Sequence, residues 1–138
     1  MFSVDVVGNL PVYAKPGDAG ADLVSAEEVV INPGETKLVM TGTSIAMPPA
    51  VVGMVCSRSG LAAKNSVFVL NAPGIVDSGY RGEIGVILHN AGQLPFSAQP
   101  GDRIAQLVFV RHVVADLNQV ESLDQTERGA SGFGSTGV

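Results

Sequence analysis

Turn-forming residues divide this chain into short apolar segments. Its 138 residues include 17 Gly and 8 Pro, with many Val and Ile between them. β-Branched residues favour strands, whereas Gly and Pro interrupt regular structure, so the pattern indicates an all-β, turn-rich fold. The length suits one hydrophobic core, and we expect residues 1–138 to form a single domain.

Alternating or continuously apolar segments predict the strands. We expect strands at residues 2–7, 19–24, 36–41, 43–47, 51–56, 66–70, 83–90 and 103–110. In the last of these, Ile104, Val108 and Val110 share a face with Gln106. A polar amide on an apolar face needs a partner. Gln106 therefore either bonds to nearby backbone or contacts a ligand, and the pattern leaves both interpretations open.

One short helix is expected after Ser57, where either Ser57 or Ser59 can cap a helix that continues to Lys64. The free backbone N–H groups of a helix start suit a phosphate. Arg58 adds a guanidinium that can grip two oxygens. From the pattern alone, an ordinary capped turn with a surface arginine is the simpler interpretation.

The stretch Asn71–Gly85 has the composition of a β-hairpin. Residues 77–79 read Asp-Ser-Gly, which favours a tight turn. Gly74 precedes this turn, and Gly82 and Gly85 follow it. Glycine at these positions would permit a close approach to the backbone. We expect a groove with Asp77 and Tyr80 at its mouth. Taken alone, Asp77 serves equally well as a turn former, and Tyr80 as a core ring.

Composition excludes several classes of protein. A net charge of −5 argues against a nucleic-acid partner, since such binding needs many Lys and Arg contacts. The sequence has no long apolar run and no signal-peptide pattern, so we expect no membrane partner and a cytoplasmic location. Cys56 is the single cysteine, which rules out an internal disulfide and favours a reducing compartment. We interpret it as a small core residue.

The C-terminal quarter of the chain is ambiguous. In residues 111–127, Val113, Leu117 and Val120 fit a helical stripe, yet the segment also suits an extended arm. Residues 128–138 are rich in glycine, and by composition alone they would form a frayed end. A glycine-rich segment can also wrap a phosphate with its N–H groups, and Phe133 can stack on a base.

Five segments, in order, resemble the motifs of the trimeric dUTP diphosphatases (dUTPases). They are Ala19–Leu23, Arg58–Ala62, Gly74–Glu83, Gly101–Leu107, and Arg128–Gly129 leading to Gly132–Gly137. The resemblance extends from about residue 2 to the C-terminus. It implies a distorted jelly roll of the β-clip type, with one short helix after Ser57 and an extended C-terminal arm.

The resemblance also implies an activity, the hydrolysis of dUTP to dUMP and pyrophosphate, which keeps uracil out of DNA and supplies dUMP for dTTP synthesis. Asp77 would be the general base for water attack on the α-phosphorus, and Asp22 would touch waters around Mg²⁺. From the residues alone, Asp22 in its strand is strained, bonded or functional. The implied substrate-binding residues are Arg58, Ser59, Gly60, Asn71, Ile75, Val76, Tyr80, Gly85, Gln106, Arg128, Phe133, Gly134 and Ser135.

Uracil would be recognised by the Asn71 side chain and by backbone groups around Ile75, Val76 and Gly85, while Tyr80 would pack under the deoxyribose. The family resemblance further implies a homotrimer in which residues 111–127 cross to a neighbouring subunit. Residues 128–138 would then form a flexible lid. One departure from the family pattern is Ser131, where a glycine is usual; we expect it to affect lid closure more than chemistry.

Three other interpretations compete. The related dCTP deaminases place a catalytic Glu on the strand after the turn and a Pro within the turn, where this chain has Ile87 and Ser78. An apolar Ile87 cannot transfer a proton, which disfavours deamination. A regulatory nucleotide-dependent binder stays open as an added role. A purely structural jelly roll would require five ordered motifs to arise by chance.

Overall fold

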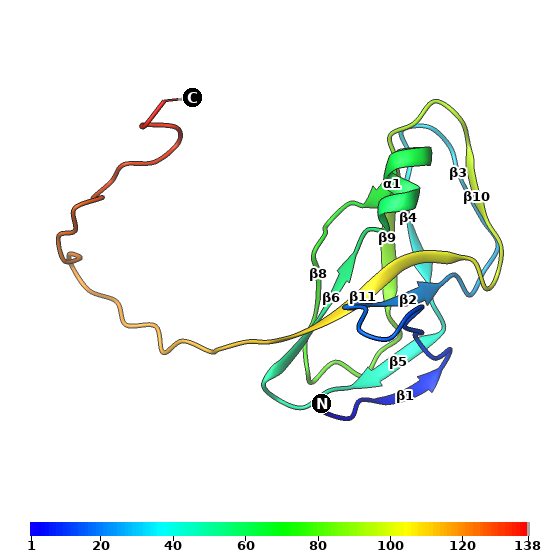
Figure 1. Cartoon of the computed structure of the whole chain (residues 1–138), viewed down its shortest axis with the longest axis horizontal. Coiled ribbons are helices and arrows are strands. Elements are labelled where there is room, and N and C mark those ends of the chain that lie inside the picture. The colour runs from blue at the N-terminus through cyan, green and yellow to red at the C-terminus, as the bar shows by residue number, and fades with distance from the viewer. Residues whose placement is uncertain (138) are drawn as a thin grey trace.

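Eleven short strands and one helix form within residues 1–137, the part of the chain that this computed structural model describes (Figure 1). The elements, in order, are β1 (Asp5–Gly8), β2 (Gly20–Val24), β3 (Val29–Ile31), β4 (Thr36–Met40), β5 (Thr43–Ala46), β6 (Val51–Cys56), α1 (Ser59–Asn65), β7 (Val67–Val69), β8 (Gly74–Val76), β9 (Gly85–Asn90), β10 (Phe96–Ala98) and β11 (Arg103–Arg111). The predicted mostly-β fold with one short helix is confirmed.

The strands form two main antiparallel sheets. One has the order β2-β11-β6-β8 and the other β4-β9-β7, while β1 pairs with β5 and β3 pairs with β10. Strands β3 and β10, of three residues each, were not among the predicted strands.

The core forms because alternate residues of each strand point inward. On β2, Ala21 and Leu23 are buried, whereas Asp22 between them is only half-buried. On β9, Val86 and Leu88 are buried. Full burial of each such aliphatic side chain stabilises the fold by roughly 1.5–3 kcal/mol. This alternation directs the polar side chain of β2 away from the core, where it is available to a site.

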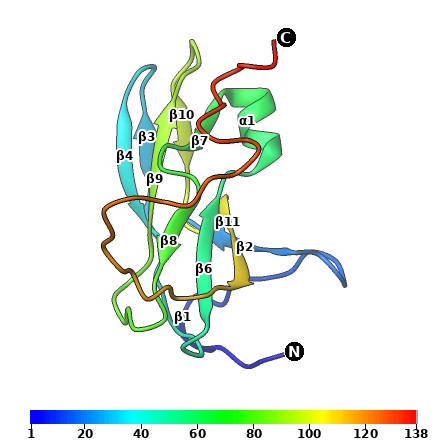
Figure 2. The ribbon, with the colours of Figure 1, turned by 90° about the vertical axis from the view of Figure 1, so that its left-hand side faces the viewer.

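The hairpin predicted at Asn71–Gly85 is wrong. Strand β8 pairs with β6, whereas β9 pairs with β4 and β7, so the two flanks of the turn belong to different sheets. The turn chemistry itself is present, because the Tyr80 N–H donates to the Asp77 carbonyl at 3.1 Å. The segment 77–84 is therefore a connection between sheets (Figure 2).

The face assigned to Gln106 is also wrong in part. The register of β11 against β2 shifts between Arg103 and Ala105, and Ile104 and Ala105 are both buried. After this irregularity the buried positions are odd-numbered, such as Leu107. Gln106 is thus turned away from the core and is half-buried. Cys56, at the end of β6, is likewise half-buried rather than in the core.

Helix α1 begins at Ser59, in the predicted place after Ser57, but neither serine caps it. Arg58 is the N-cap residue and has extended backbone angles, and its side chain makes no capping bond within the described chain. The Ser57 hydroxyl instead accepts the Val69 N–H at 2.9 Å. This bond joins the entry of the helix to β7 and fixes where Arg58 leaves the sheet.

Beyond β11 the chain is extended rather than helical, which decides between the two interpretations of residues 111–127. The segment leaves the body as a long arm, and the C-terminal residues lie far from the sheets (Figure 1). Apolar side chains on this arm are exposed, at Val113, Val114, Leu117, Val120 and Leu123. Among residues 1–137, no helix has the length and apolar character to span a membrane.

Candidate active site

Three sequence-distant motifs meet in one polar cavity of about 400 Å³. Its lining includes Asp22, Arg58, Ser59, Gly60, Arg103 and Gln106. The sheet register explains the meeting: on β11, Gln106 lies opposite Asp22 of β2 on one side and opposite Cys56 of β6 on the other. Because α1 follows β6 closely, the first residues of α1 line the same cavity as Asp22 and Gln106. We call this hollow the cationic cavity.

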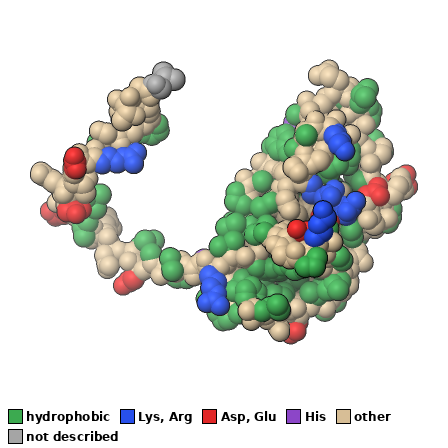
Figure 3. Space-filling view, in the orientation of Figure 1, with side chains coloured by type: hydrophobic (Ala, Val, Ile, Leu, Met, Phe, Trp, Pro, Cys, Tyr) green, Lys and Arg blue, Asp and Glu red, His purple; other side chains and the backbone are tan. Residues whose placement is uncertain are grey.

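Two arginines lie beside the Asp22 carboxylate in the cationic cavity, which Asp18 also lines. Arg58 Nε donates to Asp22 Oδ1 at 3.2 Å, and Arg103 Nη1 lies 3.8 Å from Asp22 Oδ2. Asp22 is therefore bonded, one of the three predicted options. Figure 3 shows Lys and Arg side chains gathered on this part of the surface. Arg103 was not predicted as a site residue, although it stands in the Gly101–Leu107 motif.

Gln106 bonds to backbone, as in the first of its two predicted alternatives, but the partner is 49 residues away in the sequence. Its Nε2 donates to the Ser57 carbonyl at 2.9 Å. On β2, Gly20 makes room for it, because a Cβ at that position would lie 2.0 Å from Gln106 Oε1. The amide is thus held across the sheet at the edge of the cationic cavity.

A second hollow, of about 210 Å³, lies at the other group of motif residues. Its lining is Ile75, Val76, Asp77, Tyr80, Glu83, Ile84 and Gly85, and we call it the Asp77 cavity. The Asp77 side chain is exposed at it, and the Tyr80 hydroxyl donates to the Glu83 carbonyl at 2.9 Å. Asn71 is not part of the lining, although its amide lies near Gly74. Glu83 was not predicted.

The glycines of this region are closely approached, as expected, but by the chain's own side chains. A Cβ on Gly74 would lie 3.3 Å from Asn71 Nδ2. A Cβ on Gly85 would lie 2.6 Å from Leu38 Cδ1, and one on Gly82 would lie 2.3 Å from the Tyr80 hydroxyl. Contacts between protein groups therefore account for the missing side chains at all three positions.

The predicted lid residues lie away from both cavities. Arg128, Phe133, Gly134 and Ser135 are all on the exposed arm (Figure 1). Arg128 Nε donates to the carbonyl of Ser131, and the Ser131 N–H donates back to the Arg128 carbonyl, both at 3.1 Å. Phe133 is fully exposed, with a positive φ of 52°. Within one chain, the site residues thus form three separate groups.

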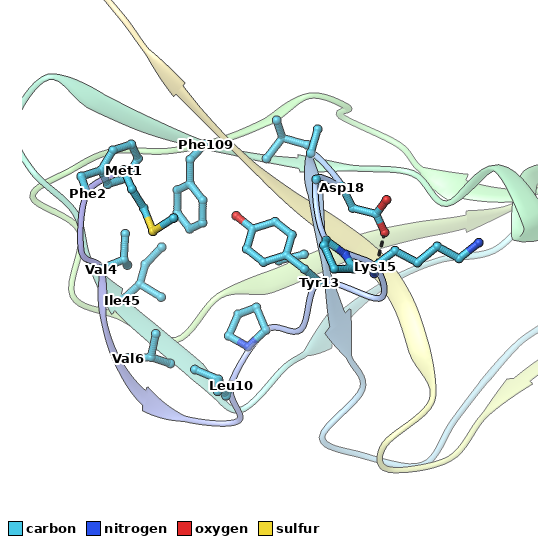
Figure 4. Close-up of a pocket in the computed structure, with 16 residues that line it drawn as sticks. Met1, Phe2, Val4, Val6, Leu10, Tyr13, Lys15, Asp18, Ile45 and Phe109 are labelled. Atoms are coloured by element: carbon cyan, nitrogen blue, oxygen red, sulfur yellow. Dashed lines mark hydrogen bonds between the residues drawn. The ribbon is translucent and has the colours of Figure 1, made fainter.

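A third hollow, of about 800 Å³, is apolar for most of its lining (Figure 4). Met1, Phe2, Val4, Ile45 and Phe109 contribute to it, from the N-terminal segment, β5 and β11. It has one charged corner, where the Lys15 N–H donates to Asp18 at 3.0 Å. This composition suits contact with apolar protein surface better than chemistry.

The described residues offer carboxylates for a metal ion but not a complete set of protein ligands. Among residues 1–137, no group of three or more His, Cys, Asp or Glu side chains converges. Both Asp22 oxygens already face guanidinium groups. These donors do not form an all-protein cage. The carboxylates of Asp18 and Asp22 line one cavity and suit a Mg²⁺ ion that is bound by waters and substrate phosphates and that they would contact through its waters.

The family model of the dUTPases matches residues 8–137, nearly the whole chain. The chain belongs to the dUTPase family. It is therefore a hydrolase of nucleotide metabolism. A deoxyuridine 5'-triphosphate nucleotidohydrolase of Cutibacterium acnes is 51% identical over 137 residues, covering 99% of this chain and 90% of the relative. That of Thermobifida fusca is 54% identical over 129 residues, covering 93% of this chain and 72% of the relative.

Solved dUTPase structures have the same jelly-roll-like fold, which confirms the predicted fold. A mutant dUTPase of Staphylococcus bacteriophage 80alpha, solved with dUpNHpp, superposes with a TM-score of 0.92 at 29% identity and covers 100% of both chains. A mutant dUTPase from phage phi11 of S. aureus, solved with a structural Mg(II) ion, has a TM-score of 0.80 at 27% identity. It covers 88% of this chain and 98% of that one.

Proposed function

We propose that this dUTPase-family enzyme converts dUTP to dUMP and pyrophosphate, with Asp77 as its general base. One observation carries the proposal: the motif residues separate into two cavities. One is lined by Arg58 and the Gln106 amide, with Asp22 paired to the arginine, and the other has the exposed carboxylate of Asp77. The first is suited to a chain of phosphates, and the second to a nucleoside with a water near its α-phosphate.

The nucleoside end would occupy the Asp77 cavity. Strand β8 offers the backbone of Ile75 and Val76, and β9 offers that of Gly85. With the Asn71 amide, these groups can pair with uracil as a base would. Cytosine has a donor where uracil has an acceptor, so it would leave a buried group unpaired. Tyr80 would pack under the deoxyribose.

The phosphate end would occupy the cationic cavity of another subunit. Arg58 can grip two phosphate oxygens while its Nε stays on Asp22. Ser59 and Gly60 begin α1 and offer backbone N–H groups, and Gln106 completes that wall. These groups neutralise the charge of the triphosphate and hold it in line for attack.

In the chemical step, Asp77 accepts a proton from a water whose oxygen bonds to the α-phosphorus. The bond from that phosphorus to the oxygen bridging to the β-phosphorus breaks, and pyrophosphate leaves with the electron pair. Bound Mg²⁺ would supply charge neutralisation on the phosphate oxygens, with Asp22 and Asp18 contacting its waters. The exposure of Asp77 supports this role, since a base must reach its water.

We further propose a homotrimer with sites shared between subunits. The two cavities share no lining residue, and the arm leaves its own body. Residues 111–127 would cross to a neighbour, burying aliphatic side chains such as Leu117 and Leu123. Residues 128–138 would close a site, with Arg128 on the phosphates, Phe133 over the base, and Gly134 and Ser135 along the phosphates. We expect this single-domain chain to act in the cytoplasm.

The test is pyrophosphate release from dUTP, dCTP, dTTP and UTP, with Mg²⁺ and with EDTA. We expect rapid release from dUTP alone, dependent on the metal. Tight binding of dUTP without release would instead indicate a regulatory binder. Deamination of dCTP would contradict the proposal and would require another proton carrier, because Ile87 stands at the position of the deaminase Glu.

A further inference from the structure

The Tyr80 ring is held by the residues that follow it. Its hydroxyl donates to the Glu83 carbonyl at 2.9 Å. A Cβ on Gly82 would lie 2.3 Å from that hydroxyl and 2.5 Å from Cζ, so the phenol occupies the space that a side chain would need. The ring therefore rests on the Gly82 backbone and is pinned at its far end. It is half-exposed, and the other side is open to the Asp77 cavity.

Glu83 is itself anchored to a different part of the fold. Its Oε1 accepts the Gly42 N–H at 2.7 Å, and Gly42 lies in the left-handed region with a φ of 68°. The next residue is anchored to the same turn, because the Ile84 N–H donates to the Thr43 carbonyl at 2.7 Å. The short link between β4 and β5 thus fixes the carbonyl that receives the Tyr80 hydroxyl.

These contacts form one continuous connection from the β4–β5 turn to the tyrosine ring. A hydrogen bond to a carboxylate is stronger than one between neutral groups. The Gly42–Glu83 bond is therefore stronger than the bond from the Tyr80 hydroxyl to the Glu83 carbonyl. Without the Gly42–Glu83 bond, residues 81–83 would be held to the β4–β5 turn only through Ile84, and the ring could tilt away from a bound sugar. A ring that tilts leaves room for a 2′-hydroxyl.

We propose that Glu83 and Gly82 are positioning residues that set the discrimination between deoxyribose and ribose. They act by fixing the Tyr80 ring under the sugar, so the inference rests on the proposed function. Glu83 keeps the ring from moving away from the sugar, and Gly82 keeps it from being pushed into the sugar.

The experiment compares kcat/KM for dUTP and for UTP in the wild type and in variants at these positions. Glu83→Ala should lower the dUTP to UTP ratio about tenfold, mainly by raising kcat/KM for UTP. Glu83→Gln keeps an acceptor for the Gly42 N–H and should restore most of the ratio. Gly82→Ala should instead raise KM for dUTP, because the new methyl group pushes the ring into the sugar site. The matched control is Glu28→Ala, an exposed carboxylate between β2 and β3.

A second variant covers the case in which Glu83→Ala does not fold. Tyr80→Phe keeps the ring and the Gly42–Glu83 bond but removes the hydroxyl donor, and it should also lower the ratio. In a Tyr80→Phe/Glu83→Ala double variant the loss should be no greater than in the more affected single variant, since both act through one connection. A folded Glu83→Ala or Tyr80→Phe enzyme with the wild-type ratio would overturn the inference. If the wild type hydrolyses no dUTP at all, the proposed function itself fails, which is a distinguishable result.

Discussion

Arg58 and Asp22 form an ion pair between the N-cap of α1 and the middle of β2, with Nε 3.2 Å from Oδ1. Both side chains are partly buried, with 27% and 16% of their surface exposed. The pair uses the Nε edge of the guanidinium, so the two terminal nitrogens keep their donors for an anion in the cationic cavity. Asp22 thereby orients the arginine, besides any contact it makes with metal-bound water.

Replacing Arg58 by lysine should separate charge from geometry. Arg58→Lys keeps the positive charge, but an ammonium cannot bond Asp22 and grip two phosphate oxygens together. We expect kcat/KM for dUTP to fall by roughly 10- to 100-fold. The free energy of unfolding should change by less than about 1 kcal/mol, because the pair is not fully buried. Pyrophosphate release and thermal denaturation measure the two effects. The control is Lys64→Arg, at an exposed position in the last turn of α1. A fully active Arg58→Lys enzyme would show that binding of two phosphate oxygens by one guanidinium is not needed.

Asp77→Asn tests the general base. We expect kcat to fall by about 10²- to 10⁴-fold, since an amide cannot accept the proton of the attacking water. Affinity for dUpNHpp, measured by calorimetry, should stay within a few-fold of the wild type, because the exposed side chain is replaced by one of equal size. Glu28→Gln provides a matched loss of one surface carboxylate. Near-normal turnover by a folded Asp77→Asn enzyme would mean that another group activates the water.

Gly20→Ala should disturb the cationic cavity by displacing the Gln106 side chain without replacing it. The new methyl group would lie 2.0 Å from Gln106 Oε1, so the amide must leave the Ser57 carbonyl. We expect kcat/KM to fall by about tenfold, because the bond that holds the Gln106 amide in place is lost. A Gly20→Ala/Gln106→Ala double variant should be no worse than Gln106→Ala alone. Additive losses would show that Gly20 matters for some other reason.

Removing residues 128–138 tests the lid. We expect kcat/KM for dUTP to fall by more than about tenfold, while thermal stability and sedimentation stay as in the full chain, because the described part of this segment packs on nothing in its own chain. Phe133→Ala should account for much of this loss, as stacking on a base contributes about 1–3 kcal/mol. Unchanged kinetics after truncation would remove the lid from the mechanism.

Sequence reasoning predicted the strands well wherever the apolar pattern was long enough. The predicted strand 51–56 matches β6 residue for residue, and 19–24 differs from β2 by one position. The prediction failed where the pairing of a strand depends on residues far away in the sequence. Asp77 begins a turn as predicted, yet its flanking strands find better partners in separate sheets.

The site shows the same division between local chemistry and tertiary pairing. The ordered motifs identified Asp22, Arg58 and Gln106, and the fold brings them into one cavity. Their mutual bonds could not be predicted, because they depend on the register of β11 against two other strands. Glu83 was missed for a similar reason: its partner, Gly42, lies 41 residues away, and no pattern in the sequence links them.

The separation of β8 from β9 has a consequence for base selectivity. Ile75 and Val76 on one wall of the Asp77 cavity belong to one sheet, whereas Gly85 on the other wall belongs to the second. The width of this slot is therefore set by how tightly the two sheets pack, and Val76 and Val86 are among the core side chains that act as spacers. Warming or a cavity-forming core substitution should widen the slot and admit a bulkier pyrimidine before the chain unfolds, so fidelity would be lost at a lower temperature than structure.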